Sequence, residues 1–158
     1  MKSMTLLCLF LLQGIAYGQV QFQVDVLTDS LAGACGVYAM DVDGDGNMDV
    51  LGAGDDNGEF IWWEQTDQAW IEHLLTDDVS GAHDVTAADL DGNGFLDIIG
   101  LTYHPALVWY EDEGSYDRHL MSDVSGAREA VPVDVDGDYD LDLVVTIPSQ
   151  NEVGWVEN

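Results

Sequence analysis

The sequence predicts an all-β fold of β-propeller blades, about three four-stranded blades in total. An aspartate-rich loop and a tryptophan each recur three times, at an interval of about 40–50 residues that is typical of one blade. The recurring positions are Asp41, Asp89 and Asp134 for the loops and Trp62, Trp109 and Trp155 for the tryptophan. Between them lie short runs rich in β-branched and aromatic residues, bounded by Gly, Asn and Asp, which are typical of strands. No part of the repeats has a sustained helical period.

The first element, residues 1–18, is predicted to be a cleaved signal peptide. Lys2 precedes an apolar run that is too short to span a bilayer, and small residues follow it. We expect a mature chain that begins at Gln19, is secreted or displayed at the cell surface, and has no membrane insertion. Loss of Cys8 leaves Cys35 as the one remaining cysteine, so we expect no internal disulfide. Cys35 is then a buried small residue or an intermolecular link.

The repeats are predicted to occupy residues 19–158. Their parts are an outer strand at 22–34, a blade at 35–82, a blade at 83–127, and a blade at 128–158 that lacks its fourth strand. The outer strand is assigned because "FQVDVLT" aligns with "WIEHLLT" and "YDRHLMS", the fourth strands of the two complete blades. Propellers typically have four to eight blades, so we expect either a longer protein or copies that associate, two copies giving six blades.

The three loops read "DVDGDGNMD", "DLDGNGFLD" and "DVDGDYDLD" and place oxygen-bearing residues at loop positions 1, 3, 5 and 9. Two carboxylates about 5 Å apart repel by roughly 0.8 kcal/mol even in water, so four in one turn favour a bound cation. With position 7 included, the candidate metal-ligating residues are Asp41, Asp43, Asp45, Asn47 and Asp49; Asp89, Asp91, Asn93, Phe95 and Asp97; and Asp134, Asp136, Asp138, Asp140 and Asp142.

Calcium is the predicted metal, because it accepts many oxygen ligands, whereas zinc would require His or Cys. The first six loop positions match the start of an EF-hand loop, but the glutamate at position 12 is missing, so the aspartate at position 9 is expected to close the site. Tyr139 stands where the other loops have glycine and would need a positive φ. The alternative is three solvated acidic turns without metal.

The D-x-D-G-D/N-G-x-x-D loops, each followed by an apolar strand and "WWEQ", "WYED" or "WVEN", resemble the VCBS/FG-GAP repeat family, to whose broad group the integrin-alpha propellers belong. The resemblance covers residues 22–158. It implies a β-propeller with calcium in the loop between the first and second strands of each blade. It also implies a role in adhesion, in ligand binding or as a module appended to a secreted enzyme.

The charge excludes several partners. With three basic residues and a net charge of -28, the chain lacks the Lys and Arg clusters that nucleic acids or anionic membranes require. No catalytic motif is present, so we expect no enzyme.

The variable rim near Tyr38, His83, Asp84 and Glu129 is the candidate ligand surface, although no ligand-binding residue is assigned.

Two repeated aromatic positions have competing interpretations. The three tryptophans favour packing between blades over a sugar-stacking platform. His73 and His119 share one position in the fourth strands, which favours a repeated structural residue over a metal or catalytic pair.

The sequence therefore predicts a secreted, calcium-binding, non-catalytic binding or adhesion scaffold with a protein or carbohydrate ligand. The alternatives are a lectin-like carbohydrate binder assembled from several copies, and an accessory module or subunit of a polysaccharide-degrading enzyme.

Overall fold

The computed structural model describes residues 22–104, 107–112, 116–121, 124 and 126–158. Within these ranges the chain forms eleven strands and no helix, which confirms the all-β class. No segment in the described part of the chain has the helical length and hydropathy of a membrane span. The predicted signal peptide at 1–18 lies outside the described residues.

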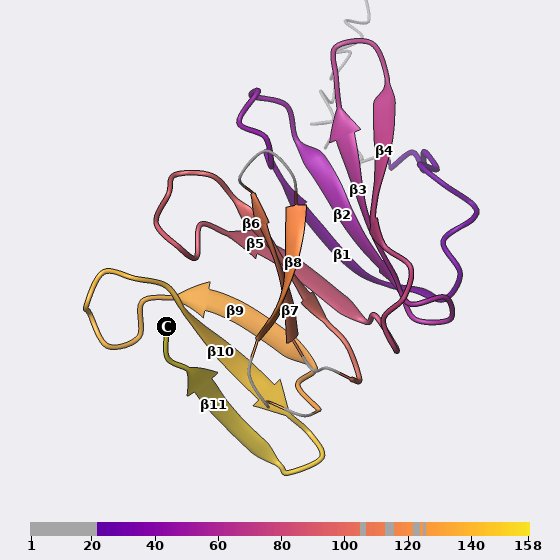
Figure 1. Ribbon diagram of the computed structural model, residues 1–158. Coiled ribbons are helices and arrows are strands. Elements are labelled where there is room, and N and C mark those ends of the chain that lie inside the picture. Colours follow the sequence, from indigo (N-terminus) through magenta and orange to yellow (C-terminus); the bar gives the residue numbers. More distant parts are fainter. Residues whose placement is uncertain (1–21, 105–106, 113–115, 122–123, 125) are drawn as a thin grey trace, which may run out of the picture.

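The strands form three antiparallel sheets, in each of which every strand pairs with the next one along the chain (Figure 1). The first sheet contains β1 (Ala34–Met40), β2 (Asp49–Gly54), β3 (Glu59–Gln65) and β4 (Trp70–Thr76). The second contains β5 (Asp84–Ala88), β6 (Asp97–Leu101), β7 (Leu107–Asp112) and β8 (Tyr116–Met121). The third contains β9 (Glu129–Val133), β10 (Asp142–Ile147) and β11 (Glu152–Val156). Short turns separate neighbouring strands, so a meander is the expected topology.

The first strands of the three sheets lie next to one another, because β5 contacts both β1 and β9. The sheets therefore fan out from a shared inner side, with the second sheet in the middle (Figure 1). Tyr38, Asp84 and Val131, one residue from each first strand, line an open cavity of about 570 Å³ on this side. A common inner side is the arrangement that blades of a propeller adopt.

Two apolar clusters hold neighbouring sheets together. Between the first and second sheets, Phe60 is fully buried and its ring meets Tyr110 edge-on, with centroids 6.2 Å apart. Between the second and third sheets, Leu107 packs in one cluster with Leu143. Both faces of the middle sheet are thus covered near β6, which explains why β6 is buried along its whole length, whereas the outer strand β8 is largely exposed.

The predicted outer strand at 22–34 is not formed, because residues 22–33 belong to no strand and Ala34 is the first residue of β1. Its predicted partner is the third strand of an incomplete blade, and that strand is β11, in the sheet farthest from β1. The segment is therefore exposed, with Phe22 91% and Val24 85% accessible. The alignment identifies a type of strand but does not supply its partner, so the outer strand at 22–34 stays a prediction.

Cys35 is also placed differently from the expectation of a buried thiol. It is exposed, and its sulfur lies 3.6 Å from the carbonyl oxygen of Ala53 and 3.4 Å from that of Ala82. The prediction was wrong because Cys35 lies at the irregular start of β1, where the register with β2 shifts between Ala34 and Gly36.

Candidate metal sites

Each aspartate-rich loop joins the first strand of a sheet to the second, as the repeat pattern predicts. In every loop, three carboxylates offer one oxygen each within 4.8 Å of the others. These groups are Asp41, Asp43 and Asp45; Asp89, Asp91 and Asp97; and Asp134, Asp136 and Asp138. The acidic clusters could therefore hold a metal ion, one per loop.

The first loop is shaped by its own side chains. Asp41 accepts a hydrogen bond through Oδ2 from the backbone N–H of Gly46, at 3.0 Å. Asp43 accepts through Oδ1 from the N–H of Asp45, at 3.0 Å, and Asp45 accepts from the N–H of Asn47, at 2.7 Å. Such aspartate-to-backbone bonds two residues along the chain stabilise tight turns. They turn the carboxylates at positions 1, 3 and 5 toward a common centre.

The other two loops repeat this hydrogen-bond pattern position by position. In the second loop the pairs are Asp89 with Gly94 at 3.0 Å, Asp91 with Asn93 at 2.9 Å, and Asn93 with Phe95 at 2.7 Å. In the third loop they are Asp134 with Tyr139 at 3.2 Å, Asp136 with Asp138 at 3.1 Å, and Asp138 with Asp140 at 3.3 Å. Asparagine serves as well as aspartate at position 5, because its carbonyl oxygen accepts the same bond.

Position 6 has a positive φ in all three loops. Gly46 adopts a φ of 95° and Gly94 a φ of 93°, and Tyr139 adopts 81° at the equivalent place. The prediction that Tyr139 needs a positive φ is confirmed. Its side chain is 96% exposed, so no packing contact compensates for the backbone strain.

Position 9 has a different role from positions 1, 3 and 5. Asp49 is completely buried, and its two oxygens accept backbone hydrogen bonds from Val42 at 3.1 Å and Gln65 at 2.7 Å. Asp142 in the third loop does the same with Val135 and Asn158, both at 3.0 Å. This aspartate ties the start of the loop to the end of the third strand. Gln65 and Asn158 are the last residues of the "WWEQ" and "WVEN" motifs, so the motif and the loop form one unit.

The equivalent Asp97 is also completely buried and accepts from the N–H of Leu90 at 2.9 Å. It is, in addition, one of the three clustered carboxylates of its loop. The expectation that position 9 closes the site thus has support in geometry for the second loop, while the anchoring role is common to all three.

Three buried carboxylate oxygens in the loops have no hydrogen-bond partner among the described residues. Oδ1 of Asp41, Oδ1 of Asp89 and Oδ1 of Asp140 are buried and receive no hydrogen bond from the protein. An unpartnered buried acceptor is costly and calls for an explanation, and an ion is a common one. Since carboxylate oxygens are hard ligands, the donor set fits a hard divalent cation.

The crowding of charge also appears in the protonation equilibria. Burial raises the pKa of Asp43, and the charges of Asp45 and Asp49 add to the rise, against the hydrogen bond from the Asp45 backbone. Burial likewise raises the pKa of Asp136, with the charge of Asp138 acting in the same direction. Both carboxylates are therefore harder to ionise than an isolated aspartate, which a bound cation would reverse.

Phe95 and Asn47 are two further predicted metal-ligating residues, both at position 7 of their loops. The Phe95 side chain is 60% exposed, so only its backbone could serve a metal. Asn47 donates from its amide to Asp45 at 3.0 Å.

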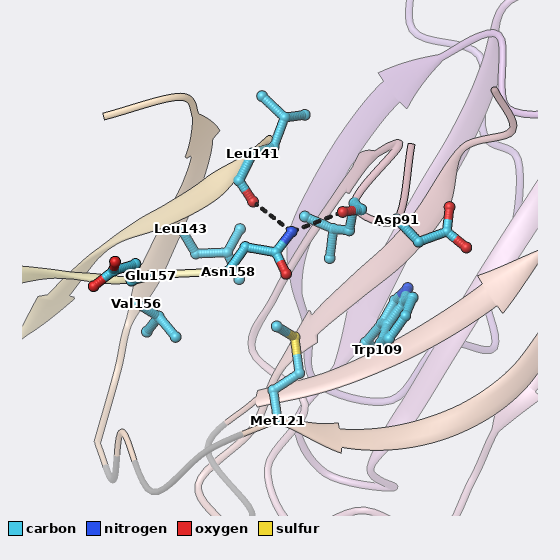
Figure 2. A pocket seen from close by; sticks show the side chains of 9 residues that line it. Asp91, Trp109, Met121, Leu141, Leu143, Val156, Glu157 and Asn158 are labelled. Atoms are coloured by element: carbon cyan, nitrogen blue, oxygen red, sulfur yellow. Dashed lines mark hydrogen bonds between the residues drawn. The ribbon is translucent and has the colours of Figure 1, made fainter. Parts of the chain in front are cut away.

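A small apolar cavity of about 180 Å³ lies beside the second and third loops (Figure 2). Trp109 and Met121 form one side of it, and Leu143 and Val156 contribute from the third sheet. Asn158 spans its mouth and donates to the carbonyl oxygens of Leu90 at 2.8 Å and Leu141 at 3.3 Å. The cavity is the space between two sheets, and Asn158 joins the two loops across it.

The predicted rim residues lie near one another, because the charges of His83 and Glu129 both act on Asp84, but not all of them line the inner cavity. Tyr38 and Asp84 line the inner cavity, whereas Glu129 is exposed outside its lining. The two ring nitrogens of His83 lie 3.0 Å from the carbonyl oxygens of Gly81 and Ala127, so this side chain bridges two sheets.

The repeated aromatic positions differ in environment. Trp62 is 7% exposed and stacks on His73, with centroids 4.4 Å apart, so it is a packing residue. His73 and His119 each lie 2.8 Å from a glutamate, Glu64 and Glu111 respectively, which confirms a repeated structural arrangement. Trp155 is 54% exposed, and within the described ranges no fourth strand pairs beside it in its sheet.

Fold and loops together define a class: all-β repeat proteins in which each sheet carries one acidic loop between its first two strands. The family model of the FG-GAP-like repeat matches residues 18–100, more than half of the chain. The chain belongs to this family. Comparison with curated proteins and with solved structures gives no match.

Proposed function

We propose that this chain is a secreted, calcium-binding β-propeller module of the VCBS/integrin-alpha type that acts as a non-catalytic binding or adhesion scaffold. The observation that carries the calcium part is the buried, unpartnered Oδ1 of Asp41 and Asp89 within loops of the same hydrogen-bond pattern. Calcium takes 6–8 oxygen ligands, and positions 1, 3 and 5 with the backbone carbonyl of position 7 supply a partial shell that water completes.

Calcium would supply charge neutralisation and cross-linking of the loop rather than chemistry on a substrate. Modules outside cells bind calcium with dissociation constants of ~10⁻⁴ to 10⁻³ M. At free calcium ten times the dissociation constant, each site stabilises the fold by about 1.4 kcal/mol, and three sites by about 4 kcal/mol. That is a large fraction of the roughly 5–15 kcal/mol by which domains are stable.

The test is calorimetric titration with calcium combined with thermal unfolding. We expect up to three sites per chain and a melting temperature about 10 °C lower in EGTA. Asp41→Asn should remove one site. The matched control is Asp77→Asn, which makes the same charge change at an exposed position beyond β4, away from the loops. Unchanged melting in EGTA, or equal loss of binding in the control, would contradict the proposal.

The scaffold part of the proposal is supported by the family and by the absence of a catalytic motif in the sequence. Incubation with a panel of polysaccharides should give no turnover, with Glu129→Gln as the comparison for any activity found. Turnover that Glu129→Gln abolishes would replace the scaffold by an enzyme. Secretion is tested by the N-terminus of the exported chain, which we expect at Gln19.

A further inference from the structure

We propose that residues 22–28 of one copy of this chain form the fourth strand of the third sheet in a second copy. The segment reads "FQVDVLT", and the fourth strands of the complete sheets read "WIEHLLT" in β4 and "YDRHLM" in β8. Its connection to the next strand is similar, five residues (29–33) against seven (77–83). β4 ends at Thr76 before β5 starts at Asp84, and the segment ends at Thr28 before β1 starts at Ala34.

The acceptor is the outer edge of β11. In the first sheet the third strand, β3, pairs with both β2 and β4, and in the second sheet β7 pairs with both β6 and β8. Among the described residues, β11 pairs only with β10. An edge strand presents unpaired backbone groups and accepts an added strand.

The side chains of β11 are more exposed than the equivalent side chains of β3. Val153 is 73% exposed, while Phe60 at the equivalent position of β3 is fully buried. Trp155 is 54% exposed, while Trp62 is 7% exposed. Phe60 and Trp62 are covered by the neighbouring sheet, and Trp62 is covered also by His73 of the fourth strand. Both covers are absent at β11.

The register follows from the complete sheets. Trp62 is opposite His73 in the first sheet, and Trp109 is opposite His119 in the second. Asp25 occupies the histidine position in the segment. The donated strand therefore places Asp25 opposite Trp155.

A second copy fits this role, whereas the segment's own third sheet does not. In the complete sheets each fourth strand leads directly into the first strand of the neighbouring sheet, β4 into β5 and β8 into β9. Since residues 22–28 lead into β1, the accepting sheet must lie beside β1. The chain's own third sheet lies instead beyond the second, and the indigo segment and β11 are on opposite sides of Figure 1.

Reciprocal donation in a two-fold pair places six sheets around one axis, within the range of closed propellers. It also packs the exposed face of β11 against the first sheet of the partner copy. The formal charge of -28 on each copy opposes the association, so it requires salt or calcium to screen the repulsion.

The test mixes two full-length variants, Asp25→Cys and Trp155→Cys, each also carrying Cys8→Ser and Cys35→Ser, under oxidising conditions with 0.15 M salt and calcium. We expect a disulfide between the two different copies. The matched control replaces Asp25→Cys with Val24→Cys, whose side chain points to the opposite face of the strand, and should cross-link at least tenfold more slowly. A chain that carries both Asp25→Cys and Trp155→Cys and forms the disulfide only within one copy would overturn the proposal.

Light scattering supplies an independent readout. The unmodified chain should have the mass of two copies, and Val26→Pro should halve it because proline removes a backbone donor from the added strand. Residue 26 lies in no strand of the single copy, so the three sheets should keep their circular dichroism. Val26→Thr keeps the donor and should keep the pair. A single-copy mass for the unmodified chain at 100 μM, together with no cross-link, would overturn the proposal.

Discussion

Replacing Asp49 with asparagine separates two roles that the aspartates of one loop have. Asp49 is buried and accepts backbone hydrogen bonds from Val42 and Gln65, whereas Asp43 in the same loop is exposed. Asn at position 49 keeps the shape and one acceptor. Its amide group, however, faces a backbone N–H that also donates, so one bond is lost and one donor remains buried without a partner.

The magnitude follows from these two bonds. A hydrogen bond to a charged group contributes about 1.5–3 kcal/mol, and a buried donor left unpaired costs about 1–3 kcal/mol. Because the first figure already contains part of the second, the substitution should cost about 2–4 kcal/mol. For a domain of this size that lowers the melting temperature by about 10 °C. The cost should be present with and without calcium, because the bonds join protein to protein.

The assay is urea unfolding followed by tryptophan fluorescence, in saturating calcium and in EGTA. Asp43→Asn is the matched control. Burial, and then neighbouring carboxylates, raise the pKa of Asp43, so its neutral replacement should be harmless or slightly stabilising in EGTA and destabilising in calcium. An Asp49→Asn protein within about 0.5 kcal/mol of the unmodified protein in EGTA would refute the anchoring role.

Three further predictions concern the loops and the core. Tyr139→Gly relieves a positive φ at an exposed position and should raise stability by about 0.5–1 kcal/mol in urea unfolding; a loss would show that the ring has a contact. Burial raises the pKa of Tyr110 to about 12, so the contribution of Tyr110 to stability should be constant below pH 10 and fall between pH 10 and 12, and Tyr110→Phe should remove that fall. Phe60→Ala should cost about 3–5 kcal/mol, because the ring is fully buried between two sheets; a cost below 1 kcal/mol would contradict the cluster.

The sequence predicts the conformation of the acidic loops well because their structure is local. Asp43 bonds a backbone group two residues away and Asp41 one five residues away, so the nine-residue pattern contains nearly all the information. The positive φ of Tyr139 follows from the same pattern, since Gly46 and Gly94 occupy its position. Strand positions are also predictable, because each turn occurs in three repeats and the three copies can be compared.

The contacts that the sequence does not reveal join residues far apart. Gln65 bonds Asp49 across sixteen residues, and Asn158 bonds Asp142 across the same separation. The constant spacing between the loop and the tryptophan motif is the feature of the sequence that could have predicted these two hydrogen bonds. The bridging role of His83 depends on Ala127, in the connection to the third sheet, which no local pattern indicates.

In each loop, one aspartate fixes the loop conformation and other carboxylates are available to bind a cation. Asp49 and its equivalents fix each loop from the inside through backbone bonds, and positions 1, 3 and 5 fix its curvature. A cation that enters therefore orders little additional chain, so its binding energy is opposed mainly by dehydration of the ion. Without the cation the same preorganisation holds like charges together. Asp43→Asn removes one of these charges, whereas Asp49→Asn breaks a buried hydrogen bond, so the two substitutions should have opposite effects on stability in EGTA. The proposed calcium should therefore raise stability without a change of fold.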